Sequence, residues 1–293
     1  MNKPDGKGIK ALSALGLVVT TVIWGSAFVV MKNSVAVISP AYLLALRFTI
    51  ASIAMVAVFW RRVRGIHQSD LICGGLLGVF LFISYFFQTY GLKYTTASKN
   101  AFITTLYVIL VPFLHWFFNK KKPSVNNMAA ALIAVFGLAL ISLEGDLSVN
   151  IGDLLTLICG FFFAFHIVFI DRYTADHDPV SLTVIQMAVA ALLSWAVALP
   201  LEGILDFGVM DQSILAGLLY LGIFSTMLCY LFQNVGQKHL SPNTSSIILS
   251  FESVFGLLFS VLFLGEPVTP KLIAGCILMF ASVILSEYKR KTG

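Results

Sequence analysis

Arg47 and Glu252 are the two full charges that fall deep inside long apolar stretches of this sequence. A charged side chain at the centre of a bilayer costs about 2.5–3.5 kcal/mol on insertion scales, so such residues usually face the protein interior and have a partner or a function. Three interpretations remain open. The two charges neutralise each other. Alternatively, Glu252 carries a coupling proton, because burial favours the uncharged form of a carboxyl group. In the third, Glu252 binds an amine while Arg47 binds a carboxylate, which suits an amino-acid-like zwitterion.

An internal repeat relates these charges to other polar residues. A shift of 145 residues aligns the segment YFFQTYGLK, which starts at Tyr85, with YLFQNVGQK, which starts at Tyr230. The same register holds to the end of the chain and places Tyr107 opposite Glu252, so we expect Tyr107 to face the same axis from the other half. Nearer the N-terminus, a shift of 139 residues pairs Arg47 with Gln186.

Several polar and aromatic side chains extend this candidate cavity. Side chains three or four residues apart share a helix face. Asn100 and Thr104 therefore lie on the face of Tyr107, and each repeat has a Tyr and a Gln three residues apart on one face. Trp24 and Phe28, four residues apart, can stack on an aromatic or amphipathic substrate, and packing alone explains them equally well. Helix-to-helix hydrogen bonds are the alternative role of Gln88 and Gln233, and a packed, structural histidine is the alternative for His166. The predicted cavity residues are Trp24, Phe28, Arg47, Tyr85, Gln88, Asn100, Thr104, Tyr107, His166, Gln186, Tyr230, Gln233 and Glu252, with Glu252 as the coupling candidate.

The elements that must position these residues are apolar helices. Of the 293 residues, 58% are hydrophobic and 11% are charged, whereas soluble domains average roughly 45–50% and about 25%. A bilayer core needs about 20 apolar residues per spanning helix, so about ten such helices leave no room for a soluble domain. The basic residues lie in short clusters between apolar runs and do not form the basic face that nucleic-acid binding requires. Ten stretches of spanning length are predicted at 11–31, 40–60, 69–92, 97–118, 124–142, 151–170, 180–200, 212–235, 243–264 and 270–287.

The basic residues predict the orientation of these stretches. With the N-terminus inside, fourteen Lys and Arg residues fall on the inner side and four on the outer side, and positive charge is retained in the cytoplasm. We therefore expect both termini to be cytoplasmic, in the plasma (inner) membrane of a prokaryote. The outer Lys32 and Lys99 are expected to reach the lipid headgroups.

The repeat divides the chain into two five-helix units, 11–142 and 151–287. Because five is odd, the second unit enters the membrane from the opposite face, which predicts an all-α membrane protein built as an inverted 5+5 repeat. Such repeats expose one site alternately to either side, so we expect a transporter and not an enzyme. No ATP-binding G-x-x-x-x-G-K-[ST] loop or H-E-x-x-H motif is present in the sequence.

Small residues in the spans predict packing and not cofactor chemistry. The four cysteines lie in four separate apolar stretches without a C-x-x-C pair, so we expect neither a metal nor another cofactor. Gly74 and Gly78 have the G-x-x-x-G spacing that lets helices approach closely. Internal packing and a dimer contact both explain this spacing, which leaves a monomer and a homodimer open.

Three motifs carry a family resemblance. They are W-G-x-x-F at Trp24–Phe28, GLKYTTASKNAFITTLYVILVP from Gly91, and SSIILSFESVFGLLFSVLFLGE from Ser245. Together they resemble the EamA-type ten-helix members of the drug/metabolite transporter superfamily. The resemblance implies a central cavity and export of small metabolites such as amino acids, nucleobases or amphipathic compounds. Many relatives have proline after the acidic residue of the ninth span. This chain has Ser253 there, so the sequence does not predict a helix break at this position.

The inverted repeat predicts a secondary active transporter that works by alternating access. The family resemblance implies that it exports a small metabolite, amino-acid-like or amphipathic. Its partners are a small-molecule substrate, the lipid bilayer and, as the candidate coupling ion, protons. An uncoupled uniporter or exchanger, with Arg47 and Glu252 as a gate pair, is the alternative.

Overall fold

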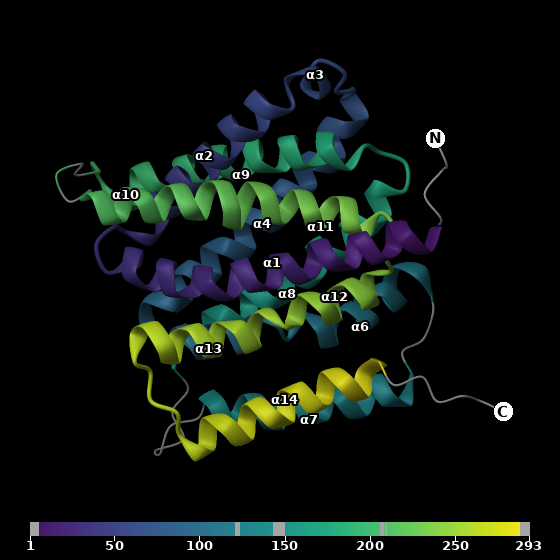
Figure 1. Cartoon of the computed structure of the whole chain (residues 1–293), viewed down its shortest axis with the longest axis vertical. Coiled ribbons are helices and arrows are strands. Elements are labelled where there is room, and N and C mark those ends of the chain that lie inside the picture. Colours follow the sequence, from purple (N-terminus) through teal and green to yellow (C-terminus); the bar gives the residue numbers. More distant parts are fainter. Residues whose placement is uncertain (1–5, 121–123, 143–149, 206–207, 209, 288–293) are drawn as a thin grey trace.

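The computed structural model of this chain is built from helices, and no strand occurs in the residues that it describes, which are 6–120, 124–142, 150–205, 208 and 210–287. The helices run roughly alongside one another (Figure 1). In chain order they are α1 (Gly6–Val35), α2 (Pro40–Val58), α3 (Trp60–Val63), α4 (Gln68–Tyr94), α5 (Ala97–Thr104), α6 (Tyr107–Asn119), α7 (Val125–Ser142), α8 (Ile151–Thr174), α9 (Pro179–Glu202), α10 (Gln212–Leu219), the π-helix η2 (Tyr220–Leu228), α11 (Cys229–Gln237), α12 (Pro242–Ser250), α13 (Glu252–Leu264) and α14 (Pro270–Glu287).

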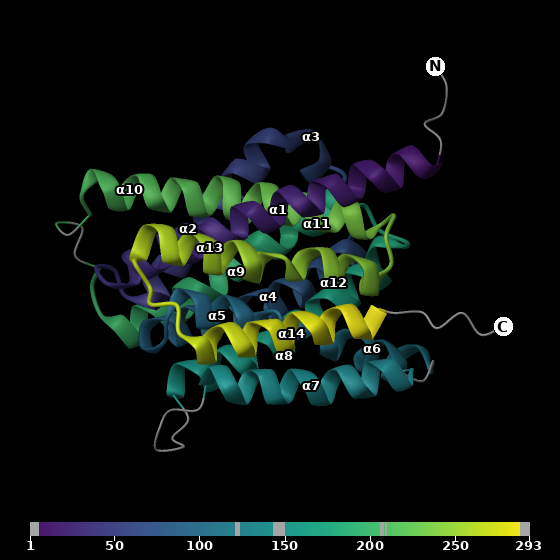
Figure 2. The same cartoon turned by 60° about the horizontal axis from the view of Figure 1, so that its bottom comes forward.

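Eight of the ten predicted stretches form helices that are long and apolar enough to cross a membrane, counted over the described residues. The other two predicted stretches correspond to α7 and α14, which contain shorter apolar segments at Met128–Gly137 and Pro270–Ser282. These two helices pack along each other at one side of the molecule (Figures 1 and 2). The start of α1 and the end of α14 lie at the same end of the bundle in both views.

Two spans are interrupted near their middles. One is divided into α5 and α6 at Thr105 and Leu106, and the other into α12 and α13 at Phe251. The second break forms without a proline after Glu252. Phe251 N donates to the oxygen of the third residue before it, Ile248 (3.2 Å), as in a tight 3₁₀ turn. The Ser253 hydroxyl donates to the Ser250 carbonyl (2.8 Å), and such local bonds compete with helical ones.

The bounds of these helices recur at a constant spacing. Ala97, Tyr107 and Val125 begin α5, α6 and α7, and residues 145 positions later begin α12, α13 and α14. The spacing differs only before this region. The N-caps of α4 and α10, His67 and Asp211, lie 144 positions apart. One additional residue is therefore accommodated between Asp211 and Tyr230, and η2 lies there, as expected because a π-helical turn takes up an extra residue.

Glycines let α4 approach α9 closely. A Cβ added to Gly74 would lie 2.7 Å from Ile185 Cβ, and one added to Gly78 would lie 2.7 Å from Val189 Cβ. Gly75, on another face of α4, has no such neighbour within 4 Å. The G-x-x-x-G spacing thus serves packing within the chain.

Two of the predicted outer lysines, Lys32 and Lys99, contact protein groups. Lys32 Nζ donates to the carbonyl oxygens of Leu92 (2.8 Å) and Thr95 (2.6 Å), which lie at the end of α4, where helix carbonyls lack intrahelical partners. Lys99 Nζ lies 3.7 Å from Asp153 Oδ2. Six of the predicted inner basic residues lie outside the described residues: Lys3, Lys121, Lys122, Lys289, Arg290 and Lys291.

Candidate functional site

A cavity lies in the middle of the helix bundle, between side chains from both sequence repeats. Its volume is about 20 Å³, which is space for about one water molecule. The cavity is therefore nearly filled by its own side chains in this conformation. Its lining residues are Trp24, Ala27, Phe28, Met31, Arg47, Tyr85, Gln88, Tyr107, Phe163, Ile167, Ser225, Tyr230, Gln233, Leu249 and Glu252.

Nine of the thirteen predicted cavity residues line this cavity, and four do not. The four are Asn100, Thr104, His166 and Gln186, which are buried. Their side chains form hydrogen bonds with residues of neighbouring helices. Asn100 Nδ2 donates to Gln88 O (3.2 Å), and Thr104 Oγ1 accepts from Gln88 Nε2 (3.2 Å). His166 Nε2 and Gln186 Oε1 are 2.8 Å apart. These four residues support the lining and do not face the cavity as the sequence predicted.

Arg47 is 1% exposed and is surrounded by neutral groups. Its Nη2 donates to the Tyr85 hydroxyl (3.1 Å) and to Ser225 Oγ (2.8 Å). Its Nε donates to Thr226 Oγ1, and its Nη1 lies 3.1 Å from the weakly accepting Met31 Sδ. The guanidinium also lies over the Tyr85 ring, 4.4 Å from the centroid. No carboxylate of the described chain pairs with Arg47.

The π-helix η2 supplies two of these contacts. Ser225 and Thr226 both lie in η2, and the carbonyl oxygen of Ser225 accepts a hydrogen bond from Trp24 Nε1 (2.8 Å). One segment therefore fixes both the guanidinium and an aromatic wall of the cavity. The sequence analysis did not identify these two residues, although a Ser-Thr pair inside the apolar run GIFSTMLC is itself a signal of a buried polar role.

Glu252 is the first residue of α13 and is 4% exposed. Its Oε1 accepts a hydrogen bond from the hydroxyl of Tyr107 (3.3 Å), which is the first residue of α6. The two repeat-related residues thus contact each other, whereas the alignment had predicted only that both face the same axis. A carboxylate at a helix N-terminus is favoured by the helix dipole.

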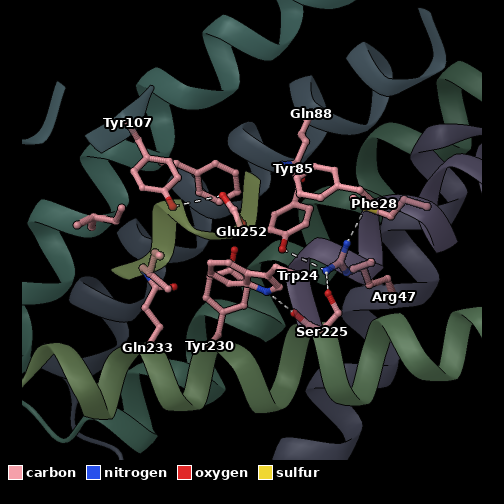
Figure 3. A pocket seen from close by; sticks show the side chains of 15 residues that line it. Trp24, Phe28, Arg47, Tyr85, Gln88, Tyr107, Ser225, Tyr230, Gln233 and Glu252 are labelled. Carbon is pink, nitrogen blue, oxygen red and sulfur yellow. Dashed lines mark hydrogen bonds between the residues drawn. The ribbon is translucent and has the colours of Figure 1, made fainter. Parts of the chain in front are cut away.

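Of the three interpretations left open by the sequence, direct pairing of Arg47 with Glu252 is not observed, since no ion pair joins them within the described part of the chain. Figure 3 shows the Tyr85 side chain between the two charges, with Trp24 and Tyr230 beside it. The ring centroids of Tyr230 lie 5.2 Å from Trp24 and 6.1 Å from Tyr85. The cavity consequently has a donor-rich end at Arg47, an acceptor end at Glu252 and an aromatic middle.

The described residues contain no group of three or more His, Cys, Asp or Glu side chains that could hold a metal ion. The cavity therefore offers hydrogen bonds, charge and aromatic surface to a ligand.

Comparison with known proteins gives a consistent result. The profile described as "EamA-like transporter family" matches residues 11–143 and 150–288. A protein of Archaeoglobus fulgidus named "Uncharacterized transporter" is 33% identical over 280 residues, which are 95% of this chain and 87% of that protein. A Salmonella typhimurium protein named "Probable amino-acid metabolite efflux pump" is 26% identical over 289 residues, 91% of this chain and 92% of that protein.

A solved structure shares the fold. It superposes with a TM-score of 0.71 at 17% sequence identity and covers 94% of this chain and 96% of the other. The described helices, the paired match of the family profile and the relatives named as transporters agree. The chain therefore belongs to the EamA-like transporter family and is an integral membrane transporter and not an enzyme.

Proposed function

We propose that this chain is a secondary active transporter that exports a small metabolite by alternating access. Two inverted five-helix halves, 11–142 and 151–287, move around the central cavity. The recurrence of helix bounds at a spacing of 145 residues supports this division, as does the separate match of the family profile to two segments. The contact between Tyr107 and Glu252 lies where the two halves meet, which is where inverted-repeat transporters bind substrate.

The proposal includes ten spans with both termini in the cytoplasm of a prokaryote. The excess of Lys and Arg on one side of the predicted spans supports this orientation. The position of the start of α1 and the end of α14 at one end of the bundle agrees with an even number of spans. Helices α7 and α14, packed against each other, are the fifth and tenth spans in this arrangement.

The observation that carries the substrate assignment is the separation of two buried charges in one cavity. Arg47 has only neutral partners, and Glu252 has a phenol as its partner. A buried charge without a counter-charge is unfavourable. A molecule that brings a carboxylate to Arg47 and an amine to Glu252 provides both counter-charges, and an apolar body suits the aromatic middle. The Salmonella relative, named for amino-acid metabolite efflux, agrees with this substrate class.

Proton coupling follows from the same arrangement. Glu252 has no cation beside it within the described residues, so in our proposal its carboxyl group holds either a proton or the substrate amine. The uncoupled alternative, with Arg47 and Glu252 as a gate pair, needs a direct contact between them. That contact is absent from this conformation, within the described residues.

The test is substrate-dependent proton movement in proteoliposomes, screened with amino acids, nucleobases and hydrophobic cations. Glu252→Gln is compared with Glu202→Gln, because Glu202 also accepts a hydrogen bond from a phenol, Tyr90, but lies outside the cavity. We expect a substrate-specific proton flux in the wild type and in Glu202→Gln, and its loss in Glu252→Gln. Substrate movement without protons in all three proteins would establish the uncoupled mechanism instead.

A further inference from the structure

A directed chain of hydrogen bonds ends at the cavity on the side of Glu252. Gln237 Nε2 donates to the carbonyl oxygen of Ile167 (3.1 Å). Gln233 Nε2 then donates to Gln237 Oε1 (3.0 Å). Both glutamines are 2% exposed. The last atom of the chain, Gln233 Oε1, is buried and has no hydrogen-bond partner within the described residues.

The direction of this chain is fixed by its first member. A backbone carbonyl can only accept, so Gln237 must turn its NH₂ group toward Ile167 and its oxygen toward Gln233. Gln233 must then turn its own NH₂ group toward Gln237. An amide is often ambiguous between its two orientations, but here the Ile167 carbonyl excludes the flipped one. The cavity-lining residue Gln233 therefore presents an acceptor and not a donor.

The repeat-related glutamine lacks this constraint. Gln88 Nε2 donates to Thr104 Oγ1, and a hydroxyl group can both donate and accept. Gln88 can therefore present either end of its amide. Gln88 and Gln233 occupy equivalent positions, 145 residues apart, yet only Gln233 is held in one orientation by a backbone carbonyl.

We propose that Gln233 Oε1 and the Glu252 carboxylate form a subsite for a cation that donates hydrogen bonds, such as a primary ammonium group. Gln237 is the positioning residue that keeps the Gln233 oxygen available. Gln233, Glu252 and Tyr107 lie together on one side of the cavity, away from Arg47 (Figure 3). This inference rests on the proposed function, because it assigns the cationic end of the same cavity.

The subsite distinguishes two cations of equal charge. A primary ammonium group satisfies the unpartnered oxygen, whereas a trimethylammonium group places methyl groups against it. Sites built to hydrogen-bond a donor reject analogues that lack the donor. The aromatic walls still attract both cations, so the trimethylated cation binds weakly and does not fail to bind altogether.

The test measures binding through Trp24, which lines the cavity. Trp60, Trp116 and Trp195 are replaced by Phe so that Trp24 is the remaining tryptophan. The purified full-length protein is titrated with phenethylamine and with phenethyltrimethylammonium. We expect phenethylamine to bind at least about 10-fold more tightly, the size of one hydrogen bond to a charged group. Gln233→Met should abolish this preference, and Gln237→Met should reduce it although Gln237 does not line the cavity.

Two further variants separate the possible failures. Gln88→Met is the repeat-related comparison: because Gln88 also lines the cavity, this change is allowed to weaken the binding of both cations, but it should keep the ratio between them. Gln233→Glu, which retains an acceptor, should keep or increase the preference. An unchanged preference in Gln233→Met overturns the inference. If Glu252→Gln then still weakens both cations, the proposed function stands without this subsite. If Glu252→Gln weakens neither cation, both the subsite and the proposed binding of an amine at Glu252 are wrong.

Discussion

Arg47 is a buried charge that has no carboxylate partner within the described residues. Its guanidinium donates to three hydroxyl groups, lies beside a thioether and stacks over an aromatic ring. These groups orient the fork of the guanidinium, but they do not neutralise its charge. In the proposed mechanism the charge is neutralised by substrate, so the free protein retains an unfavourable residue at this position.

This leads to a prediction at Arg47. Arg47→Met removes the buried charge, and its former partners are hydroxyl groups that can turn to other acceptors. Replacing buried ionic groups with apolar ones of similar volume is often neutral or stabilising by about 1–4 kcal/mol. We expect the melting temperature of purified Arg47→Met to equal or exceed that of the wild type, while transport is lost.

The control is Arg47→Lys, which keeps the charge but not the planar fork. It should lower transport at least about 10-fold and should melt no higher than the wild type. A marked loss of stability in Arg47→Met would show that Arg47 is structural, and it would count against its role in binding.

The sequence predicts much of this residue-scale picture. Arg47 and Glu252 can be identified because charged side chains inside a bilayer are energetically unfavourable and therefore rare. The sequence repeat then places Tyr107 opposite Glu252. The partners of Arg47 could not be predicted, because Ser225 and Thr226 reach it through the π-helical turn of η2. A repeat alignment at one fixed spacing does not show that turn. The sequence left open whether the two charges pair directly; in the described residues no ion pair joins them, and the Tyr85 ring lies between them.

At the scale of elements, the sequence predicts eight spans well because each has enough apolar residues to cross a bilayer. It does not predict the interruption between α12 and α13. That break is made by a tight turn and serine hydroxyl groups, which carry a much weaker sequence signal than proline. Both breaks place a helix N-terminus at the cavity, and Tyr107 and Glu252 begin those helices.

Close packing of α4 on α9 gives a prediction with a control on the same helix. A Cβ at Gly78 would lie 2.7 Å from Val189 Cβ and 2.9 Å from Gln186 O, so Gly78→Ala forces the helices apart. Overpacking of this kind costs typically 1–3 kcal/mol. Gly75→Ala meets no atom within 4 Å and should be neutral or stabilising by up to about 1 kcal/mol, because alanine favours helix.

Thermal unfolding of the two purified variants in detergent measures this difference. We expect Gly78→Ala to melt several degrees below the wild type and Gly75→Ala to melt at or above it. Equal melting temperatures would mean that α4 and α9 are not in close contact in the membrane protein. Loss of self-association in Gly75→Ala alone would instead point to a dimer contact on that face.

At the scale of the whole molecule, polar contacts hold both ends of the bundle. His177 Nδ1 lies 2.6 Å from Asp70 Oδ1 near the start of α4, and Lys99 Nζ lies 3.7 Å from Asp153 Oδ2 just beyond its end. Each contact joins a residue of the first repeat to one of the second. With space for about one water between these ends, a metabolite enters only if one end opens.

Alternating opening predicts a pattern of thiol accessibility. Leu249 lines the cavity, whereas Ala134 is buried on α7 and does not. Leu249→Cys and Ala134→Cys are made in a chain whose four native cysteines are replaced. A membrane-impermeant maleimide is then applied to right-side-out and to inside-out vesicles. We expect Leu249→Cys to react from both sides, because the cavity opens to each in turn, and Ala134→Cys to react from neither.

The contact at one end of the bundle can also be removed while the contact at the other end is kept. This change should alter the labelling rate from one side of the membrane more than from the other. Asp153→Asn removes the ion pair with Lys99 and leaves the Asp70–His177 contact intact. If Lys99 and Asp153 close the outer end, this change should raise the labelling rate of Leu249→Cys in right-side-out vesicles relative to inside-out vesicles. Labelling from one side only, unchanged by Asp153→Asn, would contradict alternating access. The cavity would then be a pocket with a single opening, and export would require another route through the fold.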